Sequence, residues 1–109
     1  MGLTKTEIFT GEQNKLAAML KAMAHPARIA ILQQILKANA CICGDLAGEL
    51  GLAQPTISQH LKELKNAGLI KGTIEGVSVC YCINPDVWFS LKNELNLFFE
   101  HYKIDETCC

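Results

Sequence analysis

Six cysteines, arranged in three closely spaced pairs, carry the most distinctive chemistry of this chain. The pairs are Cys41 and Cys43, Cys80 and Cys82, and Cys108 and Cys109. Deprotonated sulfur is a soft donor that binds soft ions, whereas Mg²⁺ and Ca²⁺ prefer oxygen ligands. A single cysteine is commonly a small buried hydrophobic residue. Three separate pairs fit that interpretation poorly, so all six are candidate ligands for a thiophilic metal or metalloid.

The helices and strands that would position these thiols are predicted from the spacing of apolar residues and from the positions of proline and glycine. Prolines at 26, 55 and 85 can each open a helix, because a first-turn proline loses no helical hydrogen bond. Helices are predicted over residues 5–24, 26–37, 44–50, 55–67 and 85–102, a short strand over 40–43, and two further strands over 69–74 and 77–83. The chain is therefore predicted to be mainly α with a small β-hairpin.

Residues 45–68, DLAGELGLAQPTISQHLKELKNAG, have the layout of a helix-turn-helix: a short helix, a glycine turn and a second helix. Several polar residues of the second helix are not needed for the core: Gln54, Thr56, Ser58, Gln59, His60 and Lys62. Such side chains read base edges or hold phosphates in DNA-binding helices. A merely solvated polar face would look the same, so the two helices alone do not decide between these interpretations.

The hairpin that follows converts this arrangement into a winged helix-turn-helix with the order ααααββα. Its strands flank a turn at Glu75 and Gly76. We expect Lys71 and Gly76 of this wing to lie along the DNA backbone. A chain of 109 residues leaves no room for a second domain, so residues 1–109 are expected to form one unit.

The wing is also expected to bring two of the three cysteine pairs close together. Residues two apart in a strand point to the same face, so each Cys-x-Cys unit presents paired thiols if it is extended. In a winged helix the short segment before the helix-turn-helix pairs with the outer wing strand. That pairing would set Cys41 and Cys43 beside Cys80 and Cys82 across about 4.8 Å. A slip of one residue in this register would turn one pair away.

The runs LKAMAHPARIAILQQIL and CICGDLAGELGLAQPTISQHLKELKNAGLIKG, followed by the hairpin, resemble the ArsR/SmtB family of bacterial metal-responsive repressors. The resemblance covers about residues 16–102, and its strongest motifs are AHPAR at 24–28 and QPTISQHL at 54–61. It implies a homodimer built from the first and last helices. It also implies that the dimer binds double-stranded operator DNA and releases it when an inducer binds.

The charge distribution agrees with a dimer. The chain carries ten Lys and Arg against eleven Asp and Glu, and its reading half, residues 54–85, has a net charge of only +1. Two copies must therefore engage the duplex together, because one domain neutralises few phosphates. A monomer would also leave Leu91, Leu95 and Phe98 of the last helix partly in water.

A thiol-only site favours arsenite or antimonite as the inducer, with Cd²⁺ or Pb²⁺ as alternatives if four sulfurs converge. No cofactor is expected to be required for folding. Many family members carry a sensing box, Cys-x-Cys-Asp or Cys-x-Gly-Asp, at the start of the helix-turn-helix. Relative to Asp45, the thiols of Cys41 and Cys43 are displaced from that box by one residue.

A second type of family site, on the last helix, does not match this chain. The corresponding positions are Asp86, Trp88, Phe99 and Tyr102, and only Asp86 retains ligand chemistry. A zinc or nickel site of that kind is therefore not expected.

Two alternatives remain. The first is a repressor with the same fold that senses thiol redox state or persulfide, in which a thiol pair oxidises instead of binding an ion. The second is a thiol-exchange enzyme or metal carrier, but the chain lacks Cys-x-x-Cys in a βαβ setting and shows no catalytic triad. We therefore expect no enzyme activity. With no apolar signal core and no membrane-length apolar run, the protein is expected to be cytoplasmic and not membrane-bound.

Overall fold

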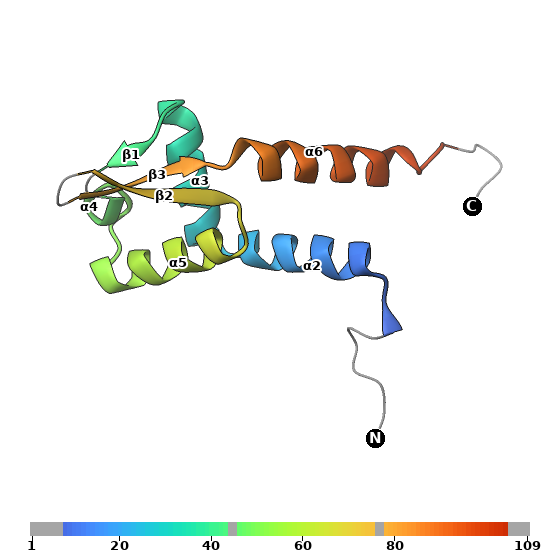
Figure 1. The fold of residues 1–109 in the computed structure, drawn as a ribbon, viewed down its shortest axis with the longest axis horizontal. Coiled ribbons are helices and arrows are strands. Elements are labelled where there is room, and N and C mark those ends of the chain that lie inside the picture. Colours follow the sequence, from blue (N-terminus) through green and yellow to red (C-terminus); the bar gives the residue numbers. More distant parts are fainter. Residues whose placement is uncertain (1–7, 44–45, 76–77, 105–109) are drawn as a thin grey trace, which may run out of the picture.

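The computed structural model describes residues 8–43, 46–75 and 78–104 (Figure 1). Its elements, in chain order, are α2 (Gly11–Met23), α3 (Pro26–Ala38), β1 (Ile42–Cys43), α4 (Leu46–Leu50), α5 (Gln54–Asn66), β2 (Ile70–Glu75), β3 (Ser78–Ile83) and α6 (Pro85–Glu100). The predicted fold class, mainly helical with a β-hairpin wing, is confirmed. The predicted short strand is present as β1, although only two residues long.

Local capping explains where the first two helices begin. The Thr10 hydroxyl accepts a hydrogen bond from the Gln13 backbone N–H at 3.0 Å, and the Gln13 side chain accepts one from the Thr10 N–H at 3.0 Å. This capping box starts α2 at Gly11, later than the predicted residue 5. At α3, Nδ1 of His25 accepts from the Ala27 N–H at 3.0 Å, and Pro26 occupies the first turn.

The three strands form an antiparallel sheet in the order β1-β3-β2. Strand β3 is central, so the segment ahead of the helix-turn-helix pairs with the second hairpin strand, as predicted. In the β1–β3 register, Ile42 lies opposite Tyr81 and Cys43 opposite Cys80. Asn39 adopts the left-handed conformation at the end of α3, with φ of 51°, and turns the chain towards β1.

The core lies where the helices meet the sheet. Its buried side chains come largely from α3, α5, the start of the wing and α6, and include Ile31, Ile35, Ile57, Leu64, Leu69, Ile70 and Leu91. Helices α2 and α6 pack against each other and run side by side away from the sheet (Figure 1). The helix-turn-helix and the wing therefore occupy one end of the molecule, and α2 with α6 the other.

Arg28 ties three helices together at the predicted AHPAR junction. Its Nε donates to Nδ1 of His60 on α5 at 3.1 Å, and its Nη1 donates to the Ala22 carbonyl oxygen near the end of α2 at 3.0 Å. The His25 and His60 rings lie in contact, with centroids 4.4 Å apart. Within the described parts of the chain, every buried side-chain nitrogen and oxygen has a hydrogen-bond partner. The junction therefore sets the position of α5 relative to α2 and α3.

His60 serves this junction as a neutral acceptor. The side chain is only 8% exposed, and its Nδ1 receives the Arg28 proton, which places the ring proton on Nε2. Burial lowers the pKa of His60, and electrostatic interaction with the neighbouring His25 and Arg28 side chains lowers that pKa further. The neutral ring is therefore the form that the folded chain favours.

We predict that His60→Ala lowers the free energy of unfolding by about 1–3 kcal/mol, because Arg28 loses a buried acceptor. The matched control is Gln59→Ala, the exposed neighbour on the same helix, which should change it by less than about 0.5 kcal/mol. Urea unfolding of both variants measures the difference. Equal effects from the two substitutions would contradict the structural role of His60.

The lowered pKa also predicts a pH dependence. Below about pH 6.5 a histidine in the unfolded chain binds a proton more readily than His60 does in the folded chain. The free energy of unfolding should therefore decrease as the pH is lowered below this value. We expect a shallower fall for His60→Gln, which removes the titrating group. NMR titration of the His60 ring provides the direct check. A midpoint at or above 6.5 in the folded protein would contradict this assignment.

Candidate nucleic-acid interface and thiol site

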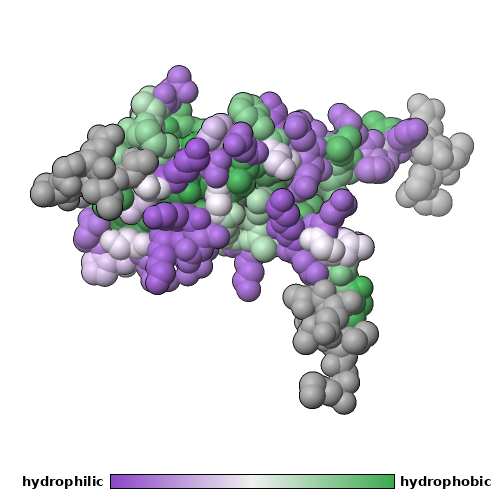
Figure 2. Space-filling view, viewed as in Figure 1, coloured by the Kyte–Doolittle hydropathy of each residue, from purple (hydrophilic) through white to green (hydrophobic). Residues whose placement is uncertain are grey.

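The polar face of α5 is exposed, and its apolar face is buried. Five residues predicted to contact DNA are solvent-exposed: Gln54, Thr56, Ser58, Gln59 and Lys62. Nε2 of Gln54 donates to Oγ of Ser58 at 3.3 Å, and Nε2 of Gln59 donates to Oε1 of Glu63 at 3.1 Å. Hydrophilic residues gather over α5 on the molecular surface (Figure 2). This helix therefore presents a row of partly preorganised amide and hydroxyl groups.

His60 is the exception among the predicted recognition residues, and its placement on the exposed face was wrong. It lies between Ile57 and Leu64 on the buried stripe, and its hydrogen-bonding nitrogen faces Arg28 rather than solvent. The spacing carried a signal for this outcome, because positions 57, 60, 61 and 64 follow the three- and four-residue repeat of a core-facing helix.

The wing adds positive charge beside α5. Lys71 on β2 is exposed, as predicted. Lys65, which the sequence did not single out, reaches from α5 to the same strand: a Cβ added at Gly72 would stand 3.3 Å from its Nζ and 3.3 Å from a Tyr81 ring carbon. Glycine at 72 thus admits the lysine and tyrosine side chains. Gly76 lies outside the described residues.

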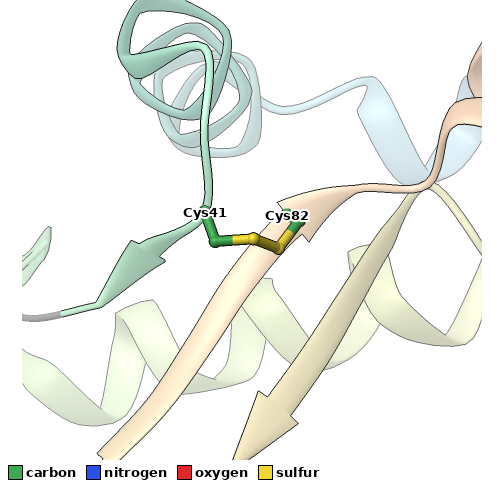
Figure 3. The surroundings of a disulfide bond; sticks show 2 residues. All are labelled: Cys41 and Cys82. Carbon is green, nitrogen blue, oxygen red and sulfur yellow. A yellow bond between two sulfur atoms is a disulfide. The ribbon is translucent and has the colours of Figure 1, made fainter. Parts of the chain in front are cut away.

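The first two cysteine pairs meet across β1 and β3. Cys41 and Cys82 form a disulfide with their Cα atoms 4.3 Å apart, which links the segment leading into β1 to the end of β3 (Figure 3). Two residues along, the Cα atoms of Cys43 and Cys80 are register partners, and Cys80 is fully buried and also disulfide-bonded. Cys108 and Cys109 lie outside the described residues. The predicted neighbourhood of Cys41, Cys43, Cys80 and Cys82 is therefore confirmed at the level of the strands.

In the structure, Cys41 and Cys82 are joined as a disulfide rather than present as free thiols. Disulfide sulfur lacks the thiolate charge that metal binding needs, so an ion requires the reduced form. Among the described residues, no three His, Cys, Asp or Glu side chains are grouped to hold a metal ion. Cys41 is exposed and Cys82 half-buried, which leaves the bond accessible to small thiol-reactive molecules.

Helix α6 divides into a buried beginning and an exposed end. Leu91 is buried within its own chain, so the expectation that it would lie partly in water was wrong. Leu95 is half-buried and Phe98 is 63% exposed, as expected. The end of α6 and the residues after it expose several large apolar side chains: Leu97, Phe98, Phe99, Tyr102 and Ile104. No helix in the described ranges is long and apolar enough to cross a membrane.

Comparison with known proteins places this geometry among transcription regulators. The family model described as bacterial regulatory protein, arsR family, matches residues 25–71. The HTH-type transcriptional repressor SmtB of Mycobacterium tuberculosis is 43% identical over 63 residues, covering 58% of this chain and 46% of the repressor, so the chain matches about half the length of that relative. The HTH-type transcriptional regulator YgaV of Escherichia coli is 35% identical over 78 residues, covering 72% of this chain and 71% of that protein.

Solved structures give the same result. HlyU from Vibrio vulnificus, a transcriptional regulator, superposes with a TM-score of 0.60 at 33% identity over 84% of this chain and 94% of that one. Reduced HlyU from Vibrio cholerae gives a TM-score of 0.64 at 29% identity, over 94% of this chain and all (100%) of its own. The homodimeric winged helix-turn-helix domain of Mb0332 from Mycobacterium bovis, at 23% identity and a TM-score of 0.65, shares the fold.

These relatives are regulators of transcription, in agreement with the expectation that the chain is not an enzyme. The matched segment contains residues 25–28 of the AHPAR junction, β1, the helix-turn-helix and the start of the wing. Together, the family model and the relatives matched over more than two-thirds of their length show that this chain belongs to the ArsR family of transcriptional regulators.

Proposed function

We propose that the chain is a homodimeric, DNA-binding repressor, built as one winged helix-turn-helix domain over residues 1–109, whose operator affinity depends on the Cys41–Cys82 pair. The disulfide between these residues carries the proposal, because it joins the segment ahead of the helix-turn-helix directly to the wing. Of the readings that the sequence left open, this geometry favours thiol redox sensing first.

The DNA contacts are assigned to exposed groups on α5 and the wing. The amides and hydroxyls of α5 suit base edges, and Lys62, Lys65 and Lys71 suit phosphates. Three lysines from one copy neutralise few phosphates, so two copies are needed for useful affinity. The apolar end of α6 offers a surface for the second copy, and the related Mb0332 domain is described as homodimeric.

The cross-link acts through the sheet. Oxidation ties Cys41 to Cys82 on β3, and β3 also pairs with β2 of the wing. On the other side of Cys41 the chain continues through β1 to α4, the first helix of the reading unit. Making or breaking the S–S bond therefore changes how α4 and α5 sit relative to the wing. A coupling of about 1–3 kcal/mol would change operator affinity roughly 5- to 150-fold.

Chelation by the same thiols is the second candidate, favoured by the strand register. After reduction, Cys41 and Cys82 provide two neighbouring thiolates, and the Cα of Cys43 lies opposite that of Cys80 two residues along. Arsenite or antimonite takes three thiolates, and Cd²⁺ or Pb²⁺ takes four. The inducer would then hold together the same two segments that the disulfide joins. Persulfide exchange at the pair is the corresponding variant of the redox function.

A gel shift with the operator separates these functions. We predict that the fully reduced protein binds DNA, and that oxidation to the Cys41–Cys82 disulfide weakens binding about 5- to 150-fold. The Cys41→Ser, Cys82→Ser double variant should stay bound under oxidant. Release by arsenite but not by peroxide or polysulfide would support chelation instead. If the double variant is released by every agent at wild-type concentrations, this pair does not control DNA binding.

A second prediction concerns DNA reading. Gln59→Ala should weaken operator binding by about 1–3 kcal/mol, the typical worth of a bidentate base contact. The matched control is Gln33→Ala, which removes an exposed glutamine from α3. Fluorescence anisotropy with labelled operator measures both variants, and their response to oxidant should match the wild type. Equal operator affinities for the two variants would exclude Gln59 as a contact.

A further inference from the structure

A small cavity opens beside the Cys41–Cys82 disulfide. It has a volume of about 300 Å³, and both cysteines form part of its wall. The end of α3 contributes Leu36, and the beginning of α6 contributes Trp88 and Phe89. The redox pair therefore faces a cavity built from two helices that lie outside the helix-turn-helix.

The lining of this cavity selects by polarity. Apart from the cysteines, the polar side-chain groups among its lining residues are the Asn39 amide and the indole N–H of Trp88, and none of those residues is charged. The volume lies at the lower end of the range for small-molecule sites. An apolar group gains by leaving water here, whereas a charged molecule would lose hydration without gaining a partner. The site thus favours a small, uncharged ligand with an apolar body.

We propose that this cavity binds the apolar group of an organic hydroperoxide and presents its peroxide oxygen to the thiol pair. This inference rests on the redox function proposed above and names the oxidant class. The disulfide indicates what reaction the site performs, and the apolar walls indicate which oxidants it admits. Hydrogen peroxide has no apolar group and gains nothing from those walls.

The reaction balances with the hydroperoxide as the sole oxidant. The thiolate of Cys41, the more exposed cysteine, attacks the terminal peroxide oxygen. The O–O bond breaks, Cys41 becomes a sulfenic acid, and the departing alkoxide takes a proton to leave as the alcohol. The Cys82 thiolate then attacks the Cys41 sulfur, forms the S–S bond and expels hydroxide, which is protonated to water. Two thiols and one hydroperoxide give one disulfide, one alcohol and one water.

The test uses the full reduced chain with cumene hydroperoxide and hydrogen peroxide as probes. Rapid quenching followed by peptide mapping gives the rate of Cys41–Cys82 disulfide formation with each. N-acetylcysteine provides the intrinsic ratio of the two rates. We expect the ratio for the protein, cumene hydroperoxide over hydrogen peroxide, to exceed that reference at least tenfold and the cumene rate to saturate. A ratio equal to the reference would overturn the inference.

Matched substitutions then locate the selectivity. Leu36→Ser and Phe89→Ser remove rim residues that are 44% and 58% exposed, so folding should survive either change. Both should reduce the ratio at least fivefold while the hydrogen peroxide rate stays constant. Ile29→Ser is the control, since Ile29 is 39% exposed on the same helix as Leu36 but does not line the cavity. Wild-type ratios in both rim variants would overturn the assignment to this cavity.

Operator binding by the same samples distinguishes failure of this inference from failure of the proposed redox-controlled repressor function. If hydrogen peroxide forms the disulfide and weakens DNA binding with no preference for cumene hydroperoxide, the cavity assignment fails and the redox repressor stands. If the Cys41–Cys82 bond forms and DNA binding does not change, the redox control of DNA binding is contradicted. The proposal that the cavity selects oxidants for that control is then contradicted as well.

Discussion

The pairing of β1 with β3 is the interaction on which the functional arrangement depends. Strand β1 has only two residues, yet it holds the segment before α4 against the central strand of the sheet. Without this pairing, Cys41 and Cys82 would be separated by 41 positions of chain with nothing to bring their Cα atoms within 4.3 Å. The pairing therefore places the proposed sensing pair beside the elements that we propose contact DNA.

A second constraint is the attachment of α5 to the helical body through Arg28. Arg28 bonds both to the end of α2 and to His60 on α5, so α5 is anchored to the helical body at a point away from the sheet. In the proposed mechanism, this anchor lies at one side and the disulfide at the other, so a change at the disulfide would alter the position of the wing relative to α5.

Much of this could be predicted from local sequence signals. Proline and apolar spacing located the helices to within two residues, except that α2 begins six residues later than predicted. The strand order expected of a winged helix placed the two Cys-x-Cys units beside each other. The misses have physical causes. His60 is polar but occupies a core position, because Arg28 provides a partner that lies 32 residues away in sequence. Leu91 is covered by its own chain, which depends on how α6 packs on the body. The cavity beside the disulfide requires α3 and α6 to meet at the sheet, and no local pattern records that.

The most direct test of the account measures operator affinity and the fraction of Cys41–Cys82 disulfide together, across a series of dithiothreitol redox buffers. If the bond controls the protein, the two quantities follow one curve with a shared midpoint, and affinity falls as the disulfide forms. An affinity that stays constant through the whole disulfide transition would contradict the account.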